Sequence, residues 1–316
     1  MRDVRIGVVG ATGAVGPVAL ELLAERGYTS VRAFASARSV GQTAKFGGEG
    51  LVVEEATPEA LAGGDLDVCL FSVGTSASRE LVPHARRGGA LCVDKSSAFR
   101  LAEGIPLVVP EVNGERALEH DGIVANPNCS TIQLVCALKP LHDAAGLSRV
   151  RLATYQAVSG AGRSKMEQLL AQEPAGGNVH MEDWTFEGDD SDEEAKLRAE
   201  TRKILELPEL PFSATCVRVP VLVGHSQAVW VETEETLSAE QARDVLGLAP
   251  SVRLVERPTP RDAVGGDEVL VGRIRRDTAN PRGLTFFVVC DNLRKGAALN
   301  AIQIAELVLE RRPIAA

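Results

Sequence analysis

A cysteine with the surroundings of a nucleophile occurs in the polar stretch Asn126-Pro127-Asn128-Cys129-Ser130-Thr131. The apolar spacing from Ile132 to Leu138 is typical of a helix that packs along one side. Because Pro127 disfavours helix entry one residue earlier and asparagine and serine are good N-caps, the helix is predicted to begin near Cys129. A thiol there meets the positive end of the helix dipole and unpaired N–H groups, and both favour the nucleophilic thiolate. The alternative is a small core cysteine near a helix end.

A nucleophilic thiol needs an acid/base partner, and His225 is the best placed of the five histidines. It stands in Gly224-His225-Ser226, which interrupts two apolar stretches, whereas the other histidines occupy helical or irregular positions. Seven residues earlier, Arg218 lies within an otherwise apolar strand. A guanidinium there needs an anion, and a substrate carboxylate is one candidate. Taken alone, a histidine in a turn is more often a surface residue.

A strand, a glycine-rich turn and a helix follow one another at the start of the chain. The apolar run 4–9 leads directly into Gly10-Ala11-Thr12-Gly13-Ala14-Val15-Gly16, and residues 18–23 are helical in pattern. Glycines in this context let the backbone approach a pyrophosphate that rests on the helix N-terminus. The spacing is GxxGxxG, so a tight turn without a ligand stays open as an alternative.

The residues after the second strand indicate which dinucleotide would bind. A site for NAD usually places Asp or Glu there to hold the ribose 2′-hydroxyl. Here the sequence is Ser36-Ala37-Arg38-Ser39, without a carboxylate. A guanidinium flanked by hydroxyls suits a 2′-phosphate, which predicts NADP in preference to NAD. The alternative is a solvated loop arginine.

The elements that carry these residues alternate between strands and helices in the first half of the chain. Strands are predicted at residues 4–9, 31–35, 68–73, 91–93, 107–109 and 122–125, with helices at 18–23 and 76–87. This alternation predicts a Rossmann-like parallel sheet wound on both faces, whose ligands bind beyond the carboxyl ends of the strands. Gly74, Ser97 and Cys129 all follow such ends, and Ser72 lies in the last residues of one strand.

After residue 146 the pattern changes to a second α+β domain with a mostly antiparallel sheet. Strands are expected at about 150–158, 213–223, 228–233, 252–256 and 284–290, and helices at about 193–206 and 238–246. The very acidic stretch 182–194 is predicted to be an exposed loop. The last helix, 296–311, is expected to pack back on the first domain, so the predicted domains are 1–128 plus 296–316 and 129–295.

Composition excludes several classes of protein. At 316 residues the chain is long enough for two domains with separate cores. No run of 18 apolar residues and no signal peptide pattern is present, so no membrane association is predicted. A net charge of −9 argues against nucleic acid as a partner. Six cysteines without a CxxC pair predict reduced core thiols, no metal site and a cytoplasmic location.

In order and combination, these motifs resemble those of the aspartate-semialdehyde dehydrogenases over nearly the whole chain. The matching stretches are 10–16, 36–39, 94–100, 126–131, 156–162, 200–203, 218–220 with 225–226, and 291–300. The resemblance implies reversible oxidation of L-aspartate 4-semialdehyde to L-4-aspartyl phosphate, dependent on NADP and inorganic phosphate. Biosynthetic flux would run toward the aldehyde, on the way to lysine (through diaminopimelate), threonine, methionine and isoleucine.

The resemblance also implies residue roles. Cys129 would attack the carbonyl, His225 would act as acid/base, and Gln156 would help to place the acyl group. Arg218 would bind the substrate carboxylate and Glu200 its ammonium group. The remaining substrate and phosphate contacts would come from Asn128, Ser97, Arg100 and Lys203. The implied cofactor contacts are Gly10, Thr12, Gly13, Ala14, Val15, Gly16, Ser36, Arg38, Ser39, Ser72, Gly74, Ser159, Gly160 and Asn292.

The family pattern implies a homodimer or homotetramer, and two stretches depart from it. Residues 174–194 are more acidic than in the family, which leaves the oligomer open. The basic run Arg163-Ser164-Lys165 leaves room for a shifted substrate. Two other functions therefore remain open: a related acyl-phosphate or acyl-CoA reductase, and a silent paralogue that only binds NADP. Arg218 with Glu200 would favour an amino acid substrate.

Overall fold

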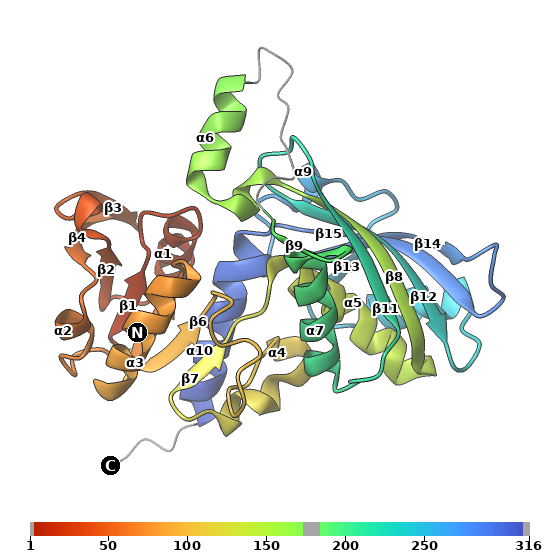
Figure 1. The fold of residues 1–316 in the computed structure, drawn as a ribbon, viewed down its shortest axis with the longest axis horizontal. Helices are drawn as coiled ribbons and strands as arrows, with labels where there is room; N and C mark the ends of the chain where they lie inside the picture. Colours follow the sequence, from red (N-terminus) through yellow and green to blue (C-terminus); the bar gives the residue numbers. More distant parts are fainter. Residues whose placement is uncertain (1–2, 173–183, 312–316) are drawn as a thin grey trace. The chain divides into compact units, whose positions relative to one another are not determined.

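The computed structural model describes residues 3–172 and 184–311. The chain forms two compact units, one of residues 1–127 with 297–316 and one of residues 128–296. Figure 1 shows the elements of both. No helix within the described ranges has the length and apolar character needed to cross a bilayer.

The first unit is built on a seven-stranded sheet in the order β3-β4-β2-β1-β5-β6-β7. Its strands are β1 (Ile6–Val9), β2 (Val31–Ala35), β3 (Thr43–Phe46), β4 (Glu49–Glu55), β5 (Val68–Phe71), β6 (Leu91–Asp94) and β7 (Ile123–Ala125). All pairs are parallel except β3 with β4. Every residue of β1, β5 and β6 is buried, as expected for strands covered on both faces. The predicted Rossmann-like sheet is confirmed.

Helices and short helical turns complete the first unit. They are α1 (Gly16–Glu25), η1 (Ala37–Ser39), α2 (Pro58–Leu61), α3 (Thr75–Arg87), α4 (Pro110–Asn113), η2 (Gly114–Glu119) and α10 (Leu299–Arg311). The C-terminal helix α10 packs on α1, β6 and η2, which joins the end of the chain to its beginning.

Two features of this unit differ from the sequence prediction. The β3–β4 hairpin was not predicted, because its strands are largely exposed and lack an apolar run. The predicted strand 107–109 is wrong: only Leu107 forms a bridge, with Ala125. Pro106 and Pro110 flank this stretch, and α4 begins at Pro110. Too few residues therefore remain between the prolines to form a series of β-sheet hydrogen bonds.

The second unit contains a six-stranded sheet in the order β11-β8-β12-β15-β14-β13. Its strands are β8 (Leu147–Gln156), β11 (Phe212–Arg218), β12 (His225–Thr233), β13 (Val252–Leu254), β14 (Val269–Arg276) and β15 (Gly283–Cys290). β12 pairs antiparallel with β8 and β15, as does β14 with β15, whereas β11–β8 and β13–β14 are parallel. The sheet is mostly antiparallel, as predicted, although β14 was missed.

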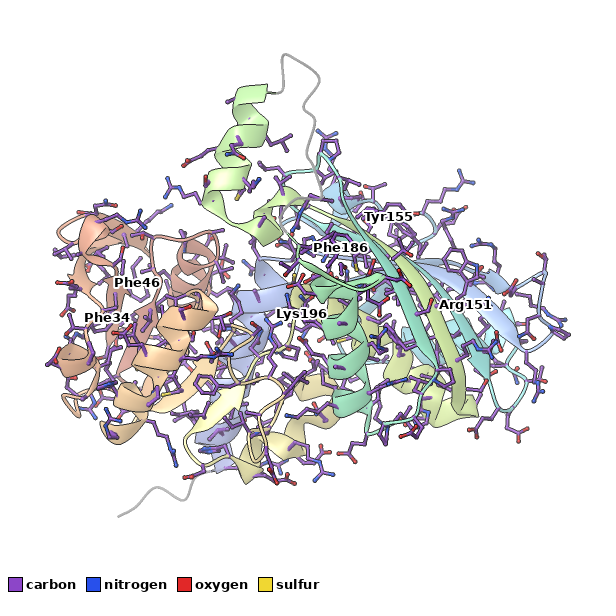
Figure 2. All side chains as sticks on the ribbon, viewed as in Figure 1. Phe34, Phe46, Arg151, Tyr155, Phe186 and Lys196 are labelled. Atoms are coloured by element: carbon purple, nitrogen blue, oxygen red, sulfur yellow. The ribbon has the colours of Figure 1, made fainter. Side chains whose placement is uncertain are left out.

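Helices cover one face of this sheet. They include α5 (Cys129–Ala145), which contacts β8, β12, β14 and β15, α7 (Asp192–Leu205), which contacts α5 and β11, and α8 (Ala239–Gly247), which contacts β13 and β14. The smaller elements are η3 (Val158–Ala161), α6 (Arg163–Gln172), the hairpin β9 (Phe186–Glu187) and β10 (Asp190–Ser191), α9 (Pro260–Ala263) and η5 (Arg294–Ala298). Strand β8 alternates, so Arg151 and Tyr155 point to the face opposite its buried residues (Figure 2).

The prediction of an exposed acidic loop at 182–194 is only partly correct: Phe186, Gly188 and Asp189 are exposed, but residues 190–194 belong to a strand and to the start of a helix, and residues 182–183 lie outside the described part. The hairpin β9–β10 leads into α7, where Ser191 and Glu194 form a reciprocal capping box. Glu193 and Glu194 are buried, with exposed fractions of 6% and 8%. Asp192, Glu193 and Glu194 are therefore the first turn of a helix, where negative charge complements the helix dipole.

Candidate active site

Cys129 is the first residue of α5, as predicted. The side chain of Asn128 caps the helix, because its Oδ1 accepts the Ser130 N–H at 2.8 Å. The Asn128 N–H donates to Glu200 Oε2 at 2.7 Å. A Cβ on Gly296 would lie 3.2 Å from the Cys129 Cβ, so this backbone packs directly on the cysteine. The half-buried thiol is thus held at a helix N-terminus, which favours the thiolate.

A cavity of about 380 Å³ in the second unit brings several predicted residues together. Cys129, Gln156 and His225 line it with Arg218, Asn128 and Gly160. The further lining residues are Ala161, Trp184, Asp192, Glu193 and Lys196. Residues far apart in sequence therefore place a thiol, an imidazole, an amide and a guanidinium around one space.

The environment of His225 determines which ring nitrogen carries the proton. The ring is completely buried, and its Nδ1 accepts the Ala157 N–H at 3.0 Å. Burial, helped by the nearby Arg218 charge, lowers the pKa of His225 to about 3, so the ring is neutral at physiological pH. With Nδ1 used as an acceptor, the proton sits on Nε2, which has no hydrogen-bond partner among the described residues. In this tautomer His225 is a hydrogen-bond donor.

Arg218 ends strand β11 and is 9% exposed. Its Nη1 donates to the Ala157 carbonyl at 3.0 Å, and its guanidinium lies over the Trp184 ring, 4.9 Å from the centroid. These contacts fix a cation in the cavity wall. The backbone at Gly160 lies against both side chains: a Cβ there would be 2.9 Å from His225 Nε2 and 3.0 Å from Arg218 Nη1.

Helix α7 supplies a polar face. Glu193, Lys196, Glu200 and Lys203 recur at helical spacing, so they lie on one side of the helix. Glu193 and Lys196 line the cavity, whereas Glu200 and Lys203 are not among its lining residues. Glu200 is 1% exposed, and burial lowers the pKa of Lys203, while Glu200 acts in the opposite direction.

Sequence reasoning missed Glu193. Its signal was present, because Glu193 stands two helical turns before Glu200, but Glu193 was also part of the stretch 182–194 that was predicted to be exposed. Trp184 was also missed, and its sequence context gives no signal for its contact with Arg218.

The predicted phosphate residue Arg100 belongs to the first unit. It is 8% exposed, and its Nε and Nη2 donate to the carbonyls of Asn126 at 3.1 Å and Lys95 at 2.6 Å. The exposed Ser97 shares a 2.9 Å hydrogen bond with Thr75. Arg100 therefore has a fixed position beside the strand ends β6 and β7.

The glycine-rich loop of the first unit fits a dinucleotide. Gly10 has φ +93°, and a Cβ there would lie 2.4 Å from the Ser72 carbonyl oxygen. A Cβ on Gly16 would lie 2.4 Å from the Ala11 oxygen, so the loop folds tightly at the N-terminus of α1. The Thr12 hydroxyl donates to Ser39 Oγ at 3.2 Å, which ties the loop to the turn after β2. Only glycine permits this backbone cradle for a pyrophosphate.

The other predicted cofactor residues lie in three places. Ala14 and Val15 complete the glycine-rich loop, Ser36 and Arg38 are exposed beside η1, and Gly74 is the N-cap of α3. In the second unit, Asn292 Nδ2 donates to Ser159 Oγ at 2.9 Å and Asn292 Oδ1 accepts the Gly224 N–H at 2.9 Å. Both residues are buried, so they hold the turn that carries His225.

The cysteines other than Cys129 are buried thiols that form no disulfide, which agrees with the predicted core thiols. Burial raises the pKa of Cys69 and Cys216 to about 12, so these thiols stay protonated. Within the described ranges no cluster of His, Cys, Asp and Glu has the composition of a metal site.

Comparisons with known proteins agree with this arrangement. A family model described as the semialdehyde dehydrogenase NAD binding domain matches residues 5–120. A second, described as the semialdehyde dehydrogenase dimerisation domain, matches residues 138–189 and 178–295. The aspartate-semialdehyde dehydrogenase of Corynebacterium glutamicum is 45% identical over 96% of this chain and 99% of its own length. The Bacillus subtilis protein of the same name is 42% identical over 96% and 97%.

Solved structures of proteins with the same name are also similar to this chain. Aspartate semialdehyde dehydrogenase II from Vibrio cholerae, complexed with ASA, has a TM-score of 0.93 and 39% identity, covering 99% of this chain and 100% of its own. Aspartate semialdehyde dehydrogenase with NADP from Candida albicans has a TM-score of 0.75 and 27% identity, covering 96% and 98%. Both domains of the chain are therefore matched in sequence and in fold.

Proposed function

The chain belongs to the aspartate-semialdehyde dehydrogenase family, and we propose that it interconverts L-aspartate 4-semialdehyde and L-4-aspartyl phosphate through a thioester on Cys129. It is thus an oxidoreductase of amino-acid biosynthesis with an NAD(P)-binding domain. The observation that most supports the proposed chemistry is the cavity in which Cys129, His225 and Arg218 meet. A nucleophile, a donor for the carbonyl oxygen and a cation for the carboxylate are what this aldehyde requires.

In the oxidative direction the Cys129 thiolate attacks the aldehyde carbon, a C–S bond forms, and the carbonyl electron pair moves to oxygen. His225 stabilises this oxygen by donating its Nε2–H, because Nδ1 is occupied by the Ala157 N–H. NADP, when bound, accepts the hydride from the same carbon, and the carbonyl is restored as a thioester. A phosphate oxygen then attacks the thioester carbon, the C–S bond breaks, and Cys129 leaves as a thiolate while the phosphate proton passes to solvent.

His225 donates this hydrogen bond twice in the reaction, because a negative oxygen develops both when the thiolate adds to the aldehyde and when phosphate adds to the thioester. A neutral donor suffices, because thiolate attack and thiolate departure need no protein base. The tautomer inferred from the Ala157 contact makes the ring a hydrogen-bond donor toward the cavity, and the acid/base role expected from the family stays a prediction.

Arg218 binds the substrate carboxylate, because it is a buried guanidinium held in the cavity wall. The phosphate contacts that the family pattern implies stay predictions, for Arg100 and Ser97 in the first unit and for Lys203 and Asn128 in the second. The protein carries a net charge of −9, so these local cations are needed to hold an anionic substrate and phosphate. The ammonium contact expected of Glu200 stays a prediction: its carboxylate accepts the Asn128 N–H, and Glu200 is not among the residues that line the cavity.

The cofactor is NADP in preference to NAD. The turn after β2 carries Ser36, Arg38 and Ser39 and has no carboxylate that would repel a 2′-phosphate. Arg38 is exposed, so its guanidinium can reach the phosphate without breaking a buried contact. The related Candida albicans structure, solved with NADP, supports the same choice.

The protein forms a homodimer through the second unit, whose family model is described as a dimerisation domain. The sheet face opposite the helices exposes Tyr155, whose ring lies 6.2 Å from that of Phe287, and it also exposes Arg151 of the same strand. Aromatic and arginine side chains on an uncovered sheet face are typical of subunit contacts. The homotetramer and the cytoplasmic location expected from the sequence stay predictions.

The reaction is tested by measuring NADPH formation with aspartate semialdehyde and inorganic phosphate, beside a panel of other aldehydes. We expect the rate to depend on phosphate and to be highest with aspartate semialdehyde. Preference for another acyl substrate would identify a related reductase instead. Binding of NADP without turnover of any aldehyde in the panel would identify a silent paralogue.

A further inference from the structure

Gln227 is a completely buried amide side chain on strand β12, two residues after His225. Alternate residues of a strand point to the same face of a sheet, so the two side chains lie on the buried face that α5 packs against. Unlike His225, Gln227 is not among the residues that line the cavity. It can therefore act on the reaction only through a residue that it contacts.

The amide of Gln227 contacts the helix that carries the nucleophile. Its Nε2 donates to the backbone carbonyl of Ser130 at 2.8 Å. A carbonyl oxygen only accepts, so it fixes which end of the amide faces it. Ser130 is the second residue of α5 and directly follows Cys129. This hydrogen bond therefore joins the strand that carries His225 to the helical turn that carries Cys129.

Ser130 is also held by the neighbouring strand β8. Its hydroxyl accepts a hydrogen bond from Gln156 Nε2 at 2.6 Å. Strand β8 pairs antiparallel with β12, and Thr154 lies opposite Gln227, so the two donors come from adjacent strands. One residue thus receives a donor from each strand, at its carbonyl and at its hydroxyl. The start of α5 is therefore attached to the sheet at two points.

The contribution of Gln227 to stability does not by itself account for an amide at this position. Its Oε1 is buried and makes no hydrogen bond within the described part of the chain. A buried acceptor without a donor destabilises the folded protein, which offsets what the hydrogen bond to Ser130 contributes. A methionine of similar length would fill the same space without an unpaired amide oxygen. The amide is therefore better explained by the residue that it positions.

We propose that Gln227 is a positioning residue that sets the separation of Cys129 and His225 by holding Ser130. The thiolate must reach the aldehyde carbon while His225 Nε2 donates to the oxygen of the same carbonyl. Both groups can act together only if the helix and the strand keep a fixed separation. The hydrogen bond to Ser130 lies one residue from the nucleophile and two residues from the donor. This inference rests on the proposed reaction and adds a positioning residue to it.

The test is Gln227→Met, which keeps the size of the side chain and removes the donor. Steady-state kinetics are measured with aspartate semialdehyde and phosphate. We expect kcat to fall about tenfold, because the two groups are no longer held at the correct separation. The KM for the aldehyde should change by less than about twofold, because Arg218 keeps its contacts. The melting temperature should shift by only a few degrees, since the unpaired amide oxygen is removed together with the hydrogen bond.

A second measurement separates the position of the thiol from its reactivity. Cys129 is alkylated with iodoacetamide over a range of pH, and the other cysteines are buried and do not compete. This reaction needs the thiolate but not His225, and the helix N-terminus that favours the thiolate is retained in Gln227→Met. We therefore expect the pH midpoint of alkylation to be the same in the variant and in the unaltered protein.

The matched control is Gln133→Met. Gln133 is equally buried one turn further along α5, and neither polar atom of its amide has a hydrogen-bond partner among the residues that the structure describes. We expect an unchanged kcat in this variant. If Gln227→Met does not fold, Gln227→Asn gives the same comparison, because its amide is one methylene too short to reach Ser130.

Three results would overturn the assignment: an unchanged kcat in Gln227→Met, an equal fall in Gln133→Met, or failure of both Gln227 variants to fold. A fall in kcat with a raised midpoint of alkylation would overturn it as well, because the start of α5 itself would then be lost. Absence of aspartate semialdehyde oxidation in the unaltered protein would instead reject the underlying reaction, before any variant is compared.

Discussion

Gly160 offers the sharpest test of the catalytic geometry. It lies in η3, after the strand that carries Gln156, and lines the cavity. In Gly160→Ala the new Cβ would lie 2.9 Å from His225 Nε2 and 3.0 Å from Arg218 Nη1. Ordinary van der Waals contact begins near 3.4 Å, so each group must retreat by about 0.5 Å. The new methyl group also lies where Nε2 would donate to the substrate.

A displacement of this size is small for the fold and large for catalysis. Misplacing a reacting group by about 1 Å costs about 100-fold in rate. We therefore expect kcat/KM for aspartate semialdehyde to fall at least tenfold and as much as about 100-fold, which corresponds to about 1.4–2.7 kcal/mol. The backbone at Gly160 does not have a positive φ, so alanine is tolerated there and the melting temperature should shift by only a few degrees.

The assay is phosphate-dependent NADPH formation, with thermal unfolding measured on the same preparation. Gly48→Ala is the control, because a Cβ there meets nothing within 4 Å. Wild-type kcat/KM in Gly160→Ala would refute the claim that His225 Nε2 faces the reacting oxygen. A loss of activity that merely follows a loss of folded protein would refute it as well.

Three further outcomes follow from the same geometry. Cys129→Ala should abolish turnover, while the Kd for NADP, measured by fluorescence titration, changes by less than about twofold. Phosphate-dependent NADPH formation at an undiminished rate in this variant would contradict the nucleophile assignment. Arg38→Asp should raise the Kd for NADP by about tenfold or more relative to that for NAD, and an unchanged ratio would exclude contact with the 2′-phosphate. His225 is neutral in the folded protein down to about pH 3, whereas in the unfolded chain it becomes protonated below pH 6.5. Its contribution to the free energy of unfolding is therefore constant above pH 6.5. Below that pH the contribution declines by about 1.4 kcal/mol per pH unit as the pH falls toward 3. Between pH 6.5 and pH 5, the free energy of unfolding measured in urea should therefore fall by about 2 kcal/mol less for His225→Asn than for the unaltered protein. If the two pH profiles were parallel, the ring would not be buried in its neutral form.

The sequence alone determined the features that depend on local chemistry. The start of α5 at Cys129 follows from Pro127 and the Asn128 cap, which act within a few residues. The glycine-rich turn and its strands are likewise local, since the positive φ of Gly10 and the tight packing at Gly16 demand glycine. The motifs also identified His225 and Arg218, although neither had a local reason to lie near Cys129.

Only the tertiary structure decided which of these residues share a cavity and how each is oriented. The Nε2–H tautomer of His225 depends on Ala157, 68 positions away, and the orientation of Gln156 depends on Ser130 and Glu193. Glu193 looked like part of an acidic surface loop, because charge in a sequence does not reveal whether distant donors will bury it. Hydrogen bonds between remote segments form only once the sheet and α7 have packed, and they decide which atom of each side chain faces the substrate.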